Sequence, residues 1–203
     1  MRYLVLASAS LALLGALATE PAVAQDIGLQ LDEIRTLVRE KRYPLALESL
    51  RLVARQIQDL RLEVVIPAFP EAPPGWTATP PLSLLEEDDI WSSRLEAQRS
   101  YTPASGSTRI DLVIDIHSPH APAAALGLSP LVSSADPTIR MRQIAGQQAR
   151  VRFVPDTGEG EVRILLGREI LITARGRGID SAEPLVRLIE RVDFAVLRAN
   201  AGI

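Results

Sequence analysis

Four strand-like segments in the second half of the chain are so closely spaced that they restrict the fold more than any other feature. They cover 139–144, 149–154, 161–166 and 169–174, with only two to six residues between neighbours. Parallel neighbours need a crossover of about a dozen residues, whereas antiparallel neighbours need only a tight turn. The intervening residues include glycines suited to such turns. The spacing therefore predicts an antiparallel meander.

Further elements extend this sheet. Residues 110–117 alternate in the order Ile-Asp-Leu-Val-Ile-Asp-Ile-His, which predicts a strand with one side in the core and the other largely in water. Residues 94–101 are its expected hairpin partner. After Ser181, a favourable N-cap, an apolar stripe predicts a helix over 182–191 packed on the sheet.

The region before the sheet divides into helices and a linker. Apolar residues at helical spacing predict helices within 27–38 and 44–60, joined as an antiparallel pair by a short connection. The pair is similar to one tetratricopeptide-type unit, but no second copy follows. From 64 to 82, six prolines forbid continuous helix. Trp76 in this segment either seals the edge of the core or forms an exposed aromatic binding platform.

The predicted fold class is therefore α+β. A helical hairpin leads through a proline-rich linker into an antiparallel sheet of about six strands, with a C-terminal helix packed on one face. The predicted organisation is a signal peptide over 1–24, the helical hairpin over 25–63, the linker over 64–92 and the α+β domain over 93–203.

The first residues are typical of an export signal. Arg2 precedes an uncharged apolar segment, and Ala22 and Ala24 stand where signal peptidase requires small side chains. We predict cleavage after Ala24 and a periplasmic or secreted product without a transmembrane segment. The alternative is an uncleaved anchor, for which the uncharged segment is barely long enough.

Composition excludes several kinds of chemistry. The chain has no cysteine, which excludes disulfides, thiolate metal sites, cysteine nucleophiles and a lipoprotein anchor. The net charge is −3, which argues against a general nucleic-acid binder, because such proteins need excess positive charge. No cofactor is predicted.

Two histidines provide the best candidate metal site. Asp115, His117 and His120 lie close together at the end of the predicted strand 110–116, and these residue types can ligate zinc and similar metals. The alternative is that both histidines lie in water on the strand and in the loop. Asp156-Thr157-Gly158 matches the aspartic protease tripeptide, but its composition favours a turn between strands.

Arginines provide the best candidate binding surface. Arg140, Arg142, Arg150 and Arg152 alternate with apolar residues on two adjacent predicted strands. If these strands pair across Gly146, we expect the four guanidinium groups to share one sheet face, where Arg163 could join them. Such a ladder is either a solvated face or a docking surface for an anionic partner.

Several segments resemble a loose group of exported proteobacterial proteins. They are Pro-Glu-Ala-Pro-Pro-Gly-Trp (70–76), Ser93-Arg94 to Tyr101, Asp115-Ile116-His117-Ser118-Pro119, Ile144-Ala145-Gly146 and Ile-Glu-Arg-Val-Asp-Phe (189–194). The likeness covers about residues 28–198 and has no catalytic signature, so it implies no functional residues. In outline the plan is also similar to α+β domains of the PsbP and Mog1 type, a likeness of fold alone.

These observations predict a non-catalytic periplasmic accessory protein. It would bind another periplasmic protein or an envelope component through the arginine-bearing sheet face, the Trp76 linker, or the groove between hairpin and sheet. One alternative is a metal-binding protein or metal-dependent hydrolase centred on Asp115, His117 and His120. Another is a small-ligand carrier, which would need a cavity lined by the sheet and the closing helix.

Overall fold

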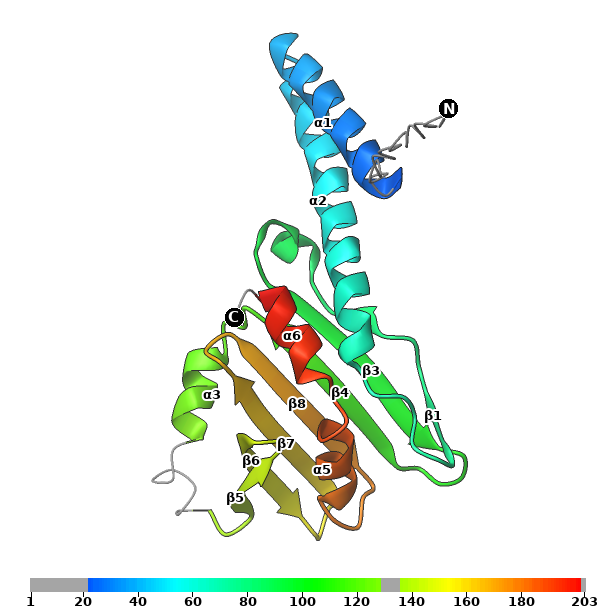
Figure 1. Cartoon of the computed structure of the whole chain (residues 1–203), viewed down its shortest axis with the longest axis vertical. Coiled ribbons are helices and arrows are strands. Elements are labelled where there is room, and N and C mark those ends of the chain that lie inside the picture. Colours follow the sequence, from blue (N-terminus) through cyan, green and yellow to red (C-terminus); the bar gives the residue numbers. More distant parts are fainter. Residues whose placement is uncertain (1–21, 129–135, 202–203) are drawn as a thin grey trace, which may run out of the picture. The chain divides into compact units, whose positions relative to one another are not determined.

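All six expected strands form, and two short strands from the proline-rich segment join them (Figure 1). The computed structural model describes residues 22–128 and 136–201. The expected strands are β3 (Leu95–Pro103), β4 (Arg109–Ile116), β5 (Ile139–Ile144), β6 (Gln147–Val154), β7 (Glu159–Leu166) and β8 (Ile170–Arg177). The additional strands are β1 (Trp76–Ala78) and β2 (Leu82–Ser83). The predicted α+β class is thus confirmed, with eight strands instead of about six.

Every strand pair described is antiparallel, and the order is β1-β3-β4-β8-β7-β6-β5, with β2 also paired to β3. The last four strands form the expected meander. Strand β4 pairs with β8, which is the last strand of the meander. The β3–β4 hairpin therefore extends the sheet beyond β8. This places β4 and β8 in the middle of the sheet, where they are the best protected from water.

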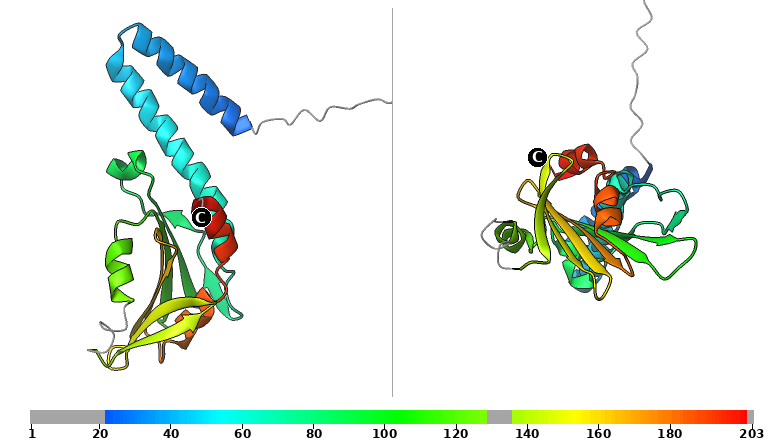
Figure 2. Two further views of the ribbon diagram at one scale, coloured as in Figure 1. Left: turned by 60° about the vertical axis from the view of Figure 1, so that its left-hand side comes forward. Right: turned by 90° about the horizontal axis from the view of Figure 1, so that it is seen from below.

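Helices cover the two sheet faces unequally (Figure 2). Helices α5 (Glu183–Ile189) and α6 (Phe194–Ala201) lie on one side with the single-turn helix η1 (Ile66–Ala68). On this side the sheet contributes the main core, including the fully buried Leu112, Ile114 and Ile172. We call this side the core face. The short helix α3 (Ala121–Gly127) contacts β7 and β8 from the other side, which we call the open face.

The N-terminal helices are α1 (Ala22–Arg39) and α2 (Tyr43–Val65), which form the predicted hairpin. The structure divides into two units between Val53 and Ala54, inside α2. The first unit has a small core of Ile34, Leu37, Ala46 and Val53. The second unit, which we call the sheet unit, contains the rest of α2, the linker and the sheet. The linker forms η1, β1, β2 and the short helix η2 (Glu87–Trp91).

The predicted export signal lies mainly outside the described residues, which begin at Ala22. Its expected cleavage site, after Ala24, falls in the first turn of α1. Within 22–128 and 136–201, none of the helices combines the length and the apolar composition needed to cross a membrane.

Candidate functional site

The four arginines of β5 and β6 do not share one sheet face, so that prediction is wrong. The turn between these strands has two residues, which pairs Ile144 with Gln147 and Arg140 with Val151. Paired residues point to the same side of a sheet, and successive residues along a strand alternate. Even-numbered residues of β5 therefore share a side with odd-numbered residues of β6. All four arginines have even numbers, so two point to each side.

Arg140 and Arg142 belong to the core face, at its edge. Arg142 Nη1 forms an ion pair with Glu183 Oε1 of α5 at 2.6 Å, which attaches the edge strand to the covering helix. Arg140 is exposed. These two residues cannot act together with Arg150 and Arg152, because the sheet lies between them.

Arg150 and Arg152 belong to the open face, where they join two arginines from the neighbouring strands. The register places Arg150 directly opposite Arg163 of β7, as the sequence suggested. It places Glu161 between Arg152 of β6 and Arg175 of β8. We call Arg150, Arg152, Arg163, Arg175 and Glu161 the arginine cluster.

Glu161 is the centre of the arginine cluster. Its Oε2 accepts hydrogen bonds from Arg163 Nη2 at 2.8 Å and from Arg175 Nε at 3.2 Å. Its Oε1 lies 3.7 Å from Arg150 Nη1. The Glu161 side chain is only 17% exposed, whereas that of Arg175 is 58% exposed. One negative charge is thus shared by several guanidinium groups.

The arginine cluster retains unused hydrogen-bonding capacity. Arg150, Arg163 and Arg175 contact the Glu161 carboxylate, and Arg152 lies opposite Glu161 on the next strand. Two further carboxylates lie nearby, because Asp111 is paired with Arg175 in the register and Asp136 acts electrostatically on Arg150 and Arg152. The arginines of the cluster still outnumber these carboxylates by one, in a chain whose net charge is −3. The Nε–H groups of Arg150 and Arg163 are buried and have no acceptor within the described part of the chain. A buried donor without an acceptor costs about 1–3 kcal/mol. An anion with several oxygens is the kind of ligand that would supply acceptors and neutralise the excess charge.

A shallow hollow borders the arginine cluster. Its volume is about 260 Å³, and its walls include Arg152, Arg175, Arg177, Glu159 and Asp111. The last strand was expected to end at residue 174, but β8 continues through Arg175 and Arg177. The alternation of the polar Thr173, Arg175 and Arg177 with Ile172, Ala174 and Gly176 was the signal in the sequence for this longer strand.

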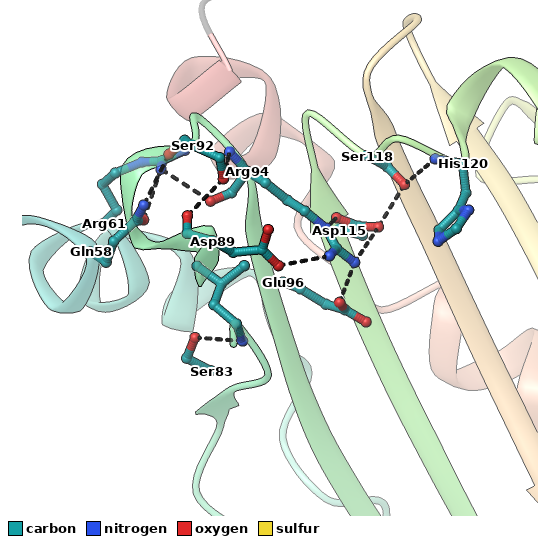
Figure 3. A network of polar contacts seen from close by, with 11 residues as sticks. Gln58, Arg61, Ser83, Asp89, Ser92, Arg94, Glu96, Asp115, Ser118 and His120 are labelled. Carbon is teal, nitrogen blue, oxygen red and sulfur yellow. Dashed lines mark hydrogen bonds and ion pairs between the residues drawn. The ribbon is translucent and has the colours of Figure 1, made fainter. Parts of the chain in front are cut away.

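A second polar group lies where β3 and β4 meet the linker (Figure 3). Arg94 Nε donates to Asp115 Oδ1 at 3.0 Å, and Arg94 Nη2 also contacts Glu96. The hydrogen bond to Asp115 raises the pKa of Arg94. Burial raises the pKa of the Glu96 carboxyl, although neighbouring Arg94 opposes this. Asp115 is only 4% exposed, so the expectation of a largely wet side for this strand is wrong at this position.

The same polar group joins α2 to the linker. Gln58 Nε2 donates to the backbone oxygens of Ile90 and Ser92, and Arg61 Nη2 donates to the backbone oxygen of Ser93 at 2.6 Å. Gln58 is itself buried. These bonds satisfy linker carbonyl groups, so they stabilise the fold at the start of β3.

The proposed metal ligands are engaged in separate contacts. Asp115 Oδ2 accepts a hydrogen bond from the Ser118 hydroxyl at 2.5 Å, and the His120 backbone N–H donates to that hydroxyl at 3.2 Å. His117, whose φ is 53°, directs Nδ1 to Glu169 Oε2 at 2.9 Å. Among the residues described, no three histidine, aspartate or glutamate side chains are arranged to hold a metal ion.

The Ser118 hydroxyl is also not arranged as a nucleophile. It donates directly to the Asp115 carboxylate, and its contact with His120 is to the backbone. An activated serine donates instead to a general base, most often a histidine ring. The contacts around Asp115 are those of a structural anchor.

Trp76 lies on the core face, in the edge strand β1, opposite Pro103 of β3. It is partly buried and packs against the main core, as expected for a residue that seals a core edge. It also lines an apolar groove of about 360 Å³ with residues of β3, β4 and α5. Trp76 and the arginine cluster therefore belong to two different surfaces.

Comparisons with known protein families, with curated proteins and with solved structures found no match to this chain.

Proposed function

We propose that this protein is a non-catalytic periplasmic accessory protein that binds an acidic segment of a partner protein through the arginine cluster. The observation that carries the proposal is the gathering of Arg150, Arg163 and Arg175 around the carboxylate of Glu161, with Arg152 opposite Glu161 on the next strand. The periplasmic location rests on the export signal expected from the sequence.

The support for an acidic partner is chemical. Guanidinium groups form paired hydrogen bonds with carboxylates and are enriched in protein interfaces. Glu161 already holds Arg163 and Arg175 in place, so little side-chain freedom remains to be lost on binding. The central strands β7 and β8 supply a rigid support for these side chains.

Photocrosslinking in cells tests this proposal. A photoreactive amino acid is introduced at position 152 or 175 on the open face, and at position 140 as the matched control. All three positions are exposed arginines of the sheet unit, but position 140 lies on the other face. We expect one recurrent partner at 152 and 175, joined through an acidic segment, and no such product at 140.

A charge-reversal variant makes the test quantitative. R152E/R175E should weaken binding of the crosslinked partner by more than about tenfold, because two attractive charges become repulsive. R140E should leave the affinity unchanged. Crosslinks spread evenly over both faces, or equal affinities of the two variants, would contradict the proposal.

A further inference from the structure

The apolar groove next to Trp76 is formed by residues from the linker, three strands and helix α5 of the sheet unit. Pro74 and Trp76 come from the linker and β1, Ile110 comes from β4, and Leu188 comes from α5. Its volume of about 360 Å³ falls within the range of roughly 300–1,000 Å³ for small-molecule sites. The groove lies between the sheet and the closing helix, which is where a small-ligand carrier would need its cavity.

The floor of the groove is apolar. The buried Tyr101 contributes to it, but its hydroxyl donates to the Pro70 backbone oxygen at 2.8 Å and is therefore already used. The Trp76 side chain supplies a flat ring, and prolines at 73 and 74 fix the adjacent backbone. A groove of rigid apolar residues loses little freedom when an apolar group enters it.

The rim of the groove is positive. Arg187 and Arg191 are four residues apart, in the last turn of α5 and just after it, and both are exposed. In the described part of the chain, neither forms an ion pair and no acidic residue lines the groove. An apolar floor beside two unpaired guanidinium groups matches a ligand with an apolar body and one anionic end.

We infer that this groove binds a small amphiphilic carboxylate. Its apolar chain lies against Trp76 and Leu188, and its carboxylate is held by Arg187 and Arg191. This inference goes beyond the proposed partner binding, because it concerns the core-face side of the sheet and a different class of ligand. The arginine cluster plays no part in it.

Fluorescence of Trp76 reports directly on the groove. The sequence has two tryptophans, and Trp91 is an exposed residue of η2, so W91F leaves Trp76 as the single reporter. Decanoate is the probe. We expect a saturable change in Trp76 emission, with one decanoate per protein chain in native mass spectra.

Charge and chain controls separate specific binding from general apolar contact. R187Q/R191Q should weaken decanoate binding by about tenfold or more, because both charge-assisted hydrogen bonds are lost. R168Q removes an exposed arginine at the β7–β8 turn and should leave binding unchanged. Decanol, which has the same chain length without the charge, should bind about tenfold more weakly than decanoate.

Several results would overturn the inference. One is the absence of a saturable change in Trp76 emission, and another is equal binding of decanol and decanoate. A third is equal decanoate affinity in R187Q/R191Q and R168Q, when circular dichroism shows that both variants are folded. A dimer that excludes decanoate would assign the groove to a second copy of the chain and would also overturn it. R152E/R175E should retain decanoate binding, which keeps this test independent of the proposed partner binding.

Discussion

The two faces of the sheet are made by the same strands but serve different purposes. On β8, Ile170, Ile172 and Ala174 are fully buried against the core. Arg175 follows Ala174, points to the other side of the sheet and is largely exposed. The alternation of side chains lets one strand hold the fold on one side and present charge on the other. The comparison teaches that charged side chains can be presented on one side of central strands whose other side forms the core.

The open face is not uniform, however. Near α3, Leu171 of β8 is buried, and Asp115, its register partner on β4, is buried with Arg94. The arginine cluster lies beyond this covered part. The open face therefore combines a covered region that contributes to stability with a charged region that remains accessible.

The largest expected effect is on the core face. Ile172→Ala should lower the free energy of unfolding by about 3–4 kcal/mol, because it removes a fully buried side chain from a central strand. Urea unfolding measures this loss. Arg175→Ala on the same strand should change it by less than about 1 kcal/mol. Equal losses for the two variants would refute the division of roles between the faces.

The covered part of the open face should be the next most sensitive. Asp115→Ala should cost about 2–3 kcal/mol, because it leaves Arg94, whose side chain is 19% exposed, without its main partner. The exposed Glu159 on the same face is the control, and E159Q should cost less than about 0.5 kcal/mol. If thermal unfolding shows equal losses, Asp115 is not the structural anchor described above.

Much of the fold could be predicted from local patterns. The strands from 139 to 177 are separated by turns too short for any other arrangement, and the alternation in 110–117 is regular. The strands β1 and β2 could not be predicted, because prolines surround them and they exist only through pairing with β3. The polar side chain of Asp115 suggested water, but Arg94, which is distant in sequence, keeps it buried.

The candidate site was predicted less well, because it depends on register. The sequence correctly indicated that arginines of β6 and β7 meet. Whether Arg140 lies on the same face as these arginines depends on whether the turn between β5 and β6 has an even or an odd number of residues. Composition alone does not determine this number. A turn of two residues between Ile144 and Gln147 places Arg140 on the other side of the sheet.

The core face also predicts a loss of stability at high pH. Tyr101 is fully buried, and burial raises its pKa from 10.0 to about 12. The native state therefore holds this proton more tightly than the unfolded state. The contribution to stability is complete below about pH 10 and decreases as the pH rises towards 12, by about 2–3 kcal/mol at most.

Urea unfolding between about pH 9 and pH 11.5 measures this decrease. Tyr101→Phe is the matched variant. It should be less stable at neutral pH by about 1 kcal/mol, because it loses the hydrogen bond to the Pro70 backbone oxygen. Its stability should fall less over the alkaline range. Identical alkaline profiles of the two proteins would show that Tyr101 is not the group responsible.

The smallest expected effect is at the turn that assigns the arginines to their faces. Ala145 has φ 49° and Gly146 has φ 75°, as in the two-residue turns that favour Asn-Gly. Ala145→Asn should raise the free energy of unfolding by about 0.5–1 kcal/mol, because asparagine tolerates this conformation better than alanine. Ala145→Val should lower it, because a β-branched residue is strained there. If urea unfolding ranks valine with asparagine, this turn does not have the left-handed conformation that separates Arg140 from the arginine cluster.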